Sequence, residues 1–481
     1  MTNKTFANIF EATKRGSVED VKDFIEQQGV DANVKDEDGC TPLHSSILNE
    51  NDAEVIKFLV SHGADVNAQD NEGKTPLHQA ILHAVRSIKC LLLRGADPNL
   101  KDKNGWTPLH DSIFKPARIA KLLVAAGADV HARNKDDRTP FHLSALYGKV
   151  ETARFLLSVG ADVNTNDKDA NTPLHSALSY DNNEHIEIVK FLISAGADIH
   201  AKNKDGNTPL HEAMPRFNEM DIDIVKTLIS AEADVNATNN SGETPLHDVV
   251  WGFRHMTRGF RAMNFATAQL LLAHGADVNA PTSGKLTPLH IAAYGRENVE
   301  GIKLLVSYGA NVNVKDYEGR TPLHSVCYNE DVEVAQVLVS ARADIYAKNE
   351  EGRTPLHAAV SANNLEVIKF LLSQGADINA KDEVGHSPLV GAAAHGENIE
   401  TLSFLVSVGA DIHTKDKDDW TPLHQAAATN ENVEIAQFLV SAGADVYAKA
   451  IDGKTPFDLA KEEENFAVAE YLAMLTTEPQ S

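Results

Sequence analysis

The sequence predicts an all-α repeat solenoid of about 14 stacked helix pairs with β-hairpin-like loops between them. Three observations lead to this fold class. A four-residue phrase, TPLH or a close variant, recurs along the chain, and most copies start about 33 residues apart. Short apolar runs alternate with turn-forming residues between the copies. The chain has 481 residues, too many for one conventional core, whereas an array in which each unit packs on its neighbours can reach this length.

The phrase begins at thirteen positions, ten of which read TPLH. The TPLH copies start at Thr41, Thr75, Thr107, Thr172, Thr208, Thr244, Thr287, Thr321, Thr354 and Thr421. The variants TPFH, SPLV and TPFD start at Thr139, Ser387 and Thr455. A second phrase, GADVN or a close relative, precedes most copies, and a turn such as KDKNG lies between the two phrases.

Each phrase has the chemistry of a helix start. Threonine supplies an N-cap oxygen, and proline fits the first helical position, where no N–H needs a partner. A second apolar helix such as 366–372 follows after a short break and ends at a glycine such as Gly375. The chain then turns back through a hairpin-like loop. Since neither helix can bury its apolar face alone, neighbouring units must stack.

Through these phrases the chain resembles the ankyrin-repeat family over about residues 6–475. The resemblance implies antiparallel helix pairs, β-hairpin loops roughly perpendicular to them, and a curved stack whose concave groove is made by hairpin tips and first helices. We expect an N-terminal capping unit at 6–35, tandem repeats at 36–454, a C-terminal capping unit at 455–475 and a tail at 476–481. The long step after Thr244 places an insertion at about 251–265.

Histidine is the residue type that most suggests chemistry, because eleven of the 21 histidines stand fourth in the phrase. They are His44, His78, His110, His142, His175, His211, His247, His290, His324, His357 and His424. With one per unit, neighbours lie about 10 Å apart, too far for one zinc ion to bridge with bonds of about 2 Å. We therefore interpret these histidines as structural, each bonded to the capping threonine and adjacent turns.

No other motif indicates catalysis or a cofactor. The phrases HExxH, GxSxG and GxxxxGK[ST] are absent, and the three cysteines, Cys40, Cys90 and Cys327, have no CxxC spacing. The sequence thus predicts no catalytic, metal-binding or cofactor-binding residue, and a protein that is not an enzyme.

The composition narrows the range of partners. A formal net charge of −25 argues against phosphate-backbone binding and against docking on anionic lipid. No apolar run has the length of a membrane span, and the first residues lack the apolar core of a signal peptide. We therefore expect a cytoplasmic monomer that binds protein, with no nucleic-acid partner and no membrane insertion.

The candidate binding residues occupy positions that vary between ankyrin units. Aromatic residues recur at the end of the first helix, and the insertion carries three arginines in a stretch without acidic residues between Asp248 and Asp277. Interfaces favour these residue types. The predicted protein-binding residues are Trp106, Phe114, Tyr147, Tyr180, Trp251, Arg254, Arg258, Arg261, Tyr294 and Tyr328. The alternatives are aromatic packing between units and a neutral insertion that lengthens a helix pair.

The favoured function is a non-catalytic scaffold or adaptor that grips a protein partner in the concave groove, by analogy with the family. Near-consensus arrays without other domains resemble those of intracellular bacteria and some eukaryotes, which adds the hypothesis of an effector exported into a host cell. The alternative from another class is a mechanical or spacer element that holds distant modules apart.

Five residues replace glycine where the pattern expects left-handed backbone. Glu232 and Arg342 take the glycine position of GAD, and Ala170, Asp137 and Asp419 take that of the hairpin. A left-handed backbone costs a non-glycine residue roughly 1–2 kcal/mol, which aspartate tolerates better. These positions are predicted to be weak joints.

Overall fold

In the structure, a computed structural model, a helix begins at each of the thirteen phrases and a second helix follows it. It describes residues 6–49, 52–83, 85–179, 185–214, 222–251, 258–295, 298–326, 332–395, 399–429 and 431–477. Within these ranges the chain forms 28 α-helices in a repeating paired pattern and no strand. The predicted fold class, an all-α solenoid of about 14 helix pairs, is confirmed.

The helices fall into two compact units, which are described separately. Unit 1 contains the described residues up to Ala213 together with Asp223–Asp234, and the other described residues form unit 2.

The helices of unit 1 are α1 (Ile9–Arg15), α2 (Val18–Lys22), the π-helix η1 (Asp23–Gln27), α3 (Pro42–Ser46), α4 (Asp52–Ser61), α5 (Pro76–His83), α6 (Val85–Leu92), α7 (Pro108–Asp111), the 3₁₀ helix η2 (Ser112–Phe114), α8 (Arg118–Ala125), α9 (Pro140–Leu146), α10 (Val150–Ser158), α11 (Pro173–Leu178), α12 (His185–Ser194), α13 (Pro209–Glu212) and, apart from its first residue, α14 (Ile222–Ser230).

The helices of unit 2 are α15 (Pro245–Trp251), α16 (Arg258–Ala273), α17 (Pro288–Tyr294), α18 (Val299–Ser307), α19 (Pro322–Ser325), α20 (Val332–Ser340), α21 (Pro355–Ser361), α22 (Leu365–Ser373), α23 (Pro388–His395), α24 (Ile399–Ser407), α25 (Pro422–Thr429), α26 (Val433–Ser441), α27 (Pro456–Glu462) and α28 (Phe466–Thr477).

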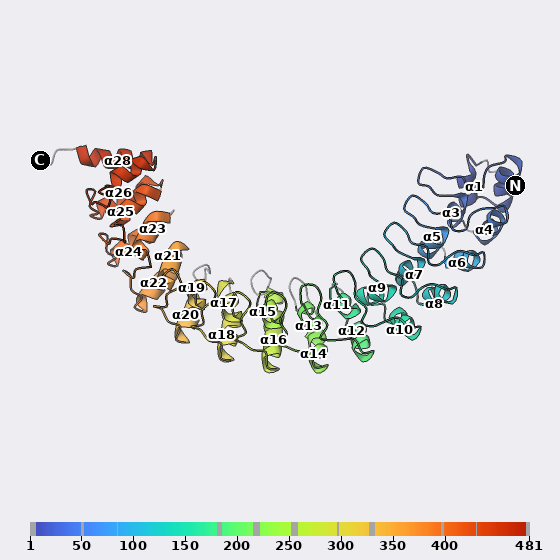
Figure 1. The fold of residues 1–481 in the computed structure, drawn as a ribbon, viewed down its shortest axis with the longest axis horizontal. Helices are drawn as coiled ribbons and strands as arrows, with labels where there is room; N and C mark the ends of the chain where they lie inside the picture. The colour runs from blue at the N-terminus through green and yellow to red at the C-terminus, as the bar shows by residue number, and fades with distance from the viewer. Residues whose placement is uncertain are drawn as a thin grey trace. The chain divides into compact units, whose positions relative to one another are not determined.

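Within each unit the odd-numbered helices, which from α3 onward start at the phrase, pack on one another, and the even-numbered helices form a second row (Figure 1). The contacts α9–α11 in unit 1 and α23–α25 in unit 2 belong to the first row, and α4–α6 and α20–α22 belong to the second. A polar hairpin loop links each pair to the next. Every helix therefore buries its apolar stripe against its own partner and the neighbouring pairs.

The start of α7 shows why the phrase begins a helix. Thr107 is extended, with φ −95° and ψ 164°, and Pro108 occupies the first helical position. The Thr107 N–H donates to Nδ1 of His110 over 3.1 Å, so the histidine completes the cap by satisfying a backbone donor. The leucine that follows the proline, Leu109, is fully buried. The phrase thus supplies a cap, a rigid first turn and a core residue in four positions.

Two kinds of glycine end these segments for different physical reasons. Gly127, which follows α8, has φ +92°, and a Cβ there would meet nothing within 4 Å. The hairpin residue Gly105 has φ +78°, and a Cβ there would also approach the backbone nitrogen of Lys135 to 2.9 Å. The hairpin position therefore needs glycine both for its left-handed backbone and for the close approach of the next hairpin.

The five non-glycine residues predicted to be left-handed are all left-handed. Their φ values are 56° at Asp137, 60° at Ala170, 68° at Glu232, 69° at Arg342 and 61° at Asp419. Sequence reasoning did not identify the left-handed Lys285, Asn363 and Glu464.

Replacing Ala170 with glycine is expected to stabilise unit 1 by about 1 kcal/mol, because relief of left-handed strain exceeds the added freedom of the unfolded chain. Glu232→Gly should raise the free energy of unfolding by less. A side chain crowds the neighbouring backbone at hairpin positions such as Gly105, but not at GAD positions such as Gly127. Urea unfolding and amide exchange of residues 167–178 would measure the gain. No gain at either position would contradict strain at these joints.

Neighbouring repeats are joined by the same hydrogen bonds at successive junctions. Between the hairpins before α7 and α9, the Lys135 N–H donates to the Asn104 carbonyl over 3.0 Å. Equivalent bonds run from Lys168 to Asp136 and, in unit 2, from Tyr317 to Gly284. One backbone bond per junction therefore sets the register of the hairpin tips.

Side chains add two further links at the same junctions. Asn99 donates to the Gly127 carbonyl over 3.0 Å and accepts from the Asp129 N–H over 2.7 Å. Nearer the tip, the Lys101 ammonium donates to the Arg133 carbonyl over 2.8 Å. In unit 2 the same kind of ladder runs through Lys315, Lys348 and Lys381, each donating to the carbonyl of the next repeat.

Candidate functional site

The phrase histidines lie in the core and perform a structural task. His142, fully buried, accepts at Nδ1 from the Thr139 N–H over 3.2 Å, while its Nε2 lies 3.2 Å from the Asn171 carbonyl. Because an N–H can only donate and a carbonyl can only accept, these partners require the neutral tautomer with hydrogen on Nε2. The structural interpretation of these histidines is confirmed.

Burial keeps these histidines neutral. Loss of solvation lowers the pKa of His110, His142 and His324 to about 4. Burial also lowers the pKa of His44, His78, His175, His247, His290, His357 and His424. In the described part of the chain, no group of three His, Cys, Asp or Glu side chains is placed to hold a metal ion.

Three of the predicted binding residues meet in unit 1. The rings of Trp106 and Phe114 are stacked, with centroids 6.3 Å apart and planes 4° apart. Phe114 meets Tyr147, at the end of the next first helix, edge to face at 4.8 Å. The side chain of Phe114 is still 47% exposed. The row therefore combines contact between repeats with apolar surface open to solvent.

A buried carboxyl group lies on the same turn as Phe114. Asp111 is 7% exposed, its Oδ2 has no hydrogen-bond partner, and desolvation raises the pKa of the carboxyl group to about 7. An uncompensated buried carboxylate is costly, so this carboxyl group takes up a proton near neutral pH, far above the range in which an exposed aspartate does.

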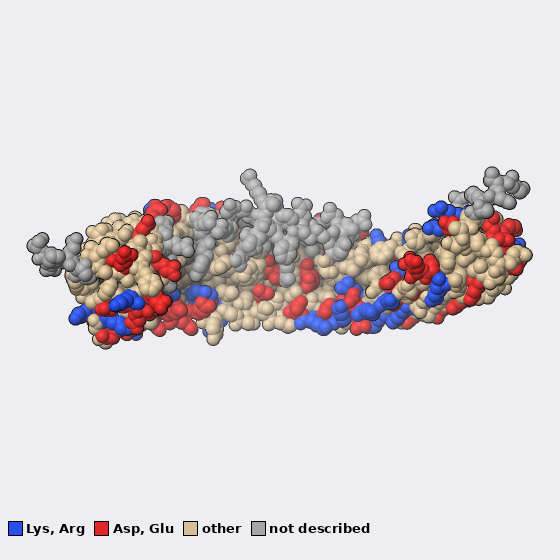
Figure 2. Space-filling model, turned by 90° about the horizontal axis from the view of Figure 1, so that it is seen from above, with Lys and Arg blue, Asp and Glu red and all other residues tan. Residues whose placement is uncertain are grey.

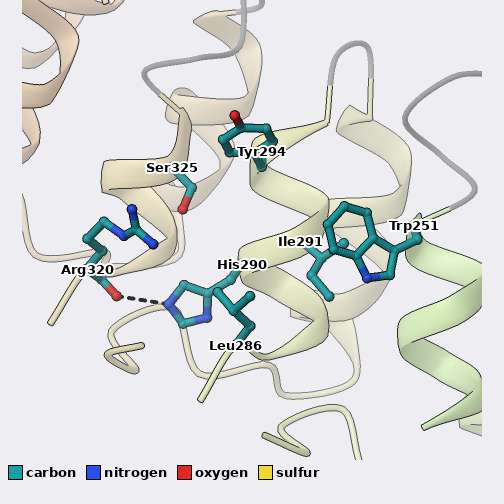
Figure 3. A pocket seen from close by; sticks show the side chains of 7 residues that line it. All are labelled: Trp251, Leu286, His290, Ile291, Tyr294, Arg320 and Ser325. Atoms are coloured by element: carbon teal, nitrogen blue, oxygen red, sulfur yellow. Dashed lines mark hydrogen bonds between the residues drawn. The ribbon is translucent and has the colours of Figure 1, made fainter. Parts of the chain in front are cut away.

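Two more predicted residues line a pocket in unit 2 (Figure 3). The pocket has a volume of about 310 Å³ and is lined by Trp251, Leu286, His290, Ile291, Tyr294, Arg320 and Ser325. Trp251 ends α15, Tyr294 ends α17 and Ser325 ends α19, so three successive first helices contribute to the pocket.

The walls of this pocket differ in character. Figure 3 shows Trp251 and Arg320 on opposite sides of Ile291, with Tyr294 at the rim. Trp251 is 37% exposed and Tyr294 43%, whereas Ile291 is buried. The His290 Nε2 donates to the Arg320 carbonyl over 3.0 Å, which ties the base of the pocket to the next repeat.

The charged wall of the pocket is neutralised within the chain. The Arg320 guanidinium lies 2.9 Å from a carboxylate oxygen of Asp316 and 2.8 Å from one of Glu318. The pocket therefore presents aromatic and aliphatic surface with one polar, charge-balanced side, which suits a large apolar side chain.

Comparison with known protein families identifies the array. The model described as "Ankyrin repeats (3 copies)" matches residues 9–102, 83–167, 112–203, 181–258, 218–316, 289–382 and 389–481. The chain belongs to the ankyrin-repeat family. Ankyrin repeats are generally protein–protein interaction modules and are typically non-catalytic. A search of curated proteins found no match to this chain.

None of the described ankyrin helices combines the length and the apolarity that crossing a bilayer requires.

Three of the predicted protein-binding residues lie outside the described residues. They are Tyr180, Arg254 and Tyr328. Arg258 and Arg261 lie in the first turns of α16, which at 16 residues is the longest second helix of those described. The part of the predicted insertion from residue 258 onward is thus helical and lengthens α16 at its N-terminus.

Sequence reasoning did not single out Leu286, Ile291 or Ser325. Leu286 stands just before the phrase, the position at which Trp106 was singled out in another ankyrin repeat. Ile291 and Ser325 directly follow the phrase histidine. Comparing these two positions across all repeats would have found all three residues.

Proposed function

We propose that this ankyrin array is a protein-binding scaffold and that the pocket of Trp251, Ile291 and Tyr294 receives an apolar side chain of the partner. The observation that supports it is a pocket shared by three successive first helices, with two partly exposed aromatic residues at its opening. Aromatic and arginine side chains around a concave centre are the usual anchors of protein interfaces.

The volume and chemistry of the pocket favour a large apolar group. A volume of about 310 Å³ accommodates one leucine, methionine or aromatic side chain, and Ile291 supplies a buried apolar floor. A spacer element would gain nothing from leaving such surface open to water, because exposed apolar patches favour unwanted association.

Trp251→Ala is expected to weaken partner binding about thirtyfold, equivalent to about 2 kcal/mol, because a central aromatic anchor would be lost. Tyr294→Ala should weaken binding in the same direction. Affinity purification would first identify partners, and titration calorimetry with the purified partner would then compare the variants.

Controls separate binding from folding. Tyr317→Ala removes a side chain that is 70% exposed on a hairpin of unit 2 outside the pocket, and it should leave affinity unchanged. Thermal unfolding of every variant must match that of the wild type, since loss of a packed tryptophan alone destabilises a protein by several kcal/mol. Folded Trp251→Ala and Tyr294→Ala proteins that bind every partner like wild type would overturn the proposal.

A further inference from the structure

Four consecutive hairpins of unit 1 carry a lysine at the same tip position. They are Lys103, Lys135, Lys168 and Lys204, all exposed. The other hairpins hold Glu37, Asn71, Asn240, Ser283, Tyr317, Glu350, Glu383, Lys417 and Ile451 at this position. The lysine is therefore not required by the repeat, and its concentration in one stretch is a property of this surface.

The structure places these tips side by side. The backbone N–H of each tip lysine donates to the preceding hairpin, as in the bond from Lys135 to Asn104. Figure 2 shows Lys and Arg side chains gathered along one edge of the molecule, over the stretch that holds α9 to α13 in Figure 1. The lysines thus form a row that runs across successive repeats.

A second set of cations stands two residues before the tips, at Lys101, Arg133 and Lys202. Lys101 donates to the Arg133 carbonyl over 2.8 Å, and Arg133 donates in turn to the Asn166 carbonyl over 2.7 Å. These bonds hold the long side chains along the row, so less side-chain entropy is lost when a ligand binds.

Ion pairs within the row balance the charges of Lys168 and Lys204, so the half of the row that contains Lys103 and Lys135 is the more positive. Lys168 pairs with Asp136, and Lys204 pairs with Asp169 at 3.7 Å. The residue equivalent to Asp136 in the preceding hairpin is the neutral Asn104. No ion pair of Lys103 or Lys135 is found among the described side chains.

The nearest carboxylate on the same hairpin is already engaged. Asp102 Oδ1 accepts from the backbone N–H groups of Asn104 and Trp106, both over 2.8 Å. Lys101, Lys103, Arg133 and Lys135 therefore form the part of this edge that is best able to bind an anion.

Aromatic surface lies in the same two repeats as these four cations. Trp106 follows Lys103 by three residues in the same hairpin and stacks on Phe114, which is nearly half exposed. A ligand that lies across the hairpin edge can thus reach both positive charge and an apolar ring surface within the same two repeats.

We propose that the surface formed by Lys101, Lys103, Arg133, Lys135, Trp106 and Phe114, here called the basic edge, binds an acidic segment of a partner protein. The inference rests on the proposed role of the array as a protein-binding scaffold, but it concerns a different unit and different residues from the pocket. Carboxylates of the segment lie over the cations, and an apolar or aromatic side chain packs on the Trp106–Phe114 pair.

Repeat geometry defines the acidic segment further. Successive repeats are about 10 Å apart, and a polyproline II chain rises about 3.1 Å per residue with three residues per turn. Every third side chain then returns to the same face, so an acidic residue at every third position matches the spacing of the tip lysines. A nucleic-acid backbone is a poorer fit, because its charges recur about every 3.4 Å along a strand, more closely than the tip lysines, and its phosphates offer nothing apolar to the Trp106–Phe114 pair.

The test uses fluorescence anisotropy of the full chain with a labelled synthetic peptide. The peptide has glutamate at every third position, one phenylalanine, and glycine or serine elsewhere; in the control peptide glutamine replaces glutamate. We expect only the glutamate peptide to bind, with affinity that falls as salt rises from about 0.05 M to about 0.15 M. Lys103→Glu combined with Lys135→Glu should weaken binding at least tenfold.

Lys417→Glu is the matched control. Lys417 occupies the same tip position in unit 2, between Asp416 and Asp418, so its reversal should leave peptide binding unchanged. The proposal for the basic edge would be overturned if the two peptides bound equally well. It would also be overturned if Lys417→Glu weakened peptide binding as much as the double variant does. The proposal would also be overturned if an oligothymidylate probe bound the wild type more tightly than the peptide does and no longer bound the double variant. Trp251→Ala should not alter peptide binding, so the proposals for the pocket and for the basic edge can be contradicted independently of each other.

Discussion

Lowering the pH from about 7.5 to about 5.5 is expected to destabilise both units through their buried histidines. The folded chain keeps these histidines neutral, with the pKa of His142 and His324 lowered to about 4, whereas an unfolded histidine has a pKa of about 6.5. The unfolded state therefore takes up more protons as the pH falls through this window. Stability is fully present above about pH 6.5 and is lost progressively down to about pH 4.

The expected loss of stability over this pH range follows from proton linkage. Each histidine with a folded pKa of about 4 loses about 1.3 kcal/mol of stabilisation over this interval. Asp111 opposes the trend locally, because its raised pKa makes the folded state take up a proton over the same range. The repeat of α7 should thus lose less stability than the repeats of α9 and α19.

Amide exchange followed by mass spectrometry, corrected for intrinsic rates, would measure this change repeat by repeat. The chain provides its own control, since α23 carries Val390 at the position where eleven other helices that start at a phrase carry histidine. Protection should fall less around α23 than around α9 and α19. Protection that is independent of pH, or lost to the same extent at α23, would contradict the mechanism.

His142→Val is expected to cost on the order of 3 kcal/mol at neutral pH. The change leaves the buried Thr139 N–H without its acceptor and the Asn171 carbonyl without its donor. The repeat of α23, which naturally lacks the histidine, shows a related defect, because the buried Ser387 hydroxyl has no hydrogen-bond partner. The variant should also take up about one proton fewer on acid unfolding, so its stability should depend less steeply on pH.

Urea unfolding at two pH values would measure both effects. His131→Val makes the same chemical change on the exposed surface of the preceding hairpin and should shift stability by no more than about 0.5 kcal/mol. A His142→Val protein as stable as wild type would show that the cap and the link to the next repeat contribute little.

The fold could be predicted from the sequence because each part of the phrase acts locally. A threonine cap, a proline in the first turn and a glycine at a left-handed position are determined by backbone geometry within a few residues. The same reasoning identified Ala170 and Glu232 as left-handed. The hydrogen-bond partners of the phrase histidines could also be predicted, because the repeat places the same groups beside each of these histidines.

The candidate site was harder to predict because its geometry depends on neighbouring repeats. Phe114 contacts Tyr147 because consecutive first helices both end in aromatic residues, whereas Trp251 and Tyr294 leave a pocket between them. Equivalent sequence positions thus produced a contact in unit 1 and a cavity in unit 2. The tip lysines were overlooked because charged hairpins are usually solvated, and only their register shows that they form a row.

The uniform junctions have a consequence for how such a gene can change in length. Within each unit, successive described seams present the same backbone donor and acceptor, such as the Lys135 N–H facing the Asn104 carbonyl. Unequal recombination that removes or duplicates one whole period rejoins groups that already match, so the product keeps a continuous core. A crossover that changes the length by part of a period leaves these groups without partners and breaks the stack. Whole repeats are therefore the natural unit of gain and loss in this chain.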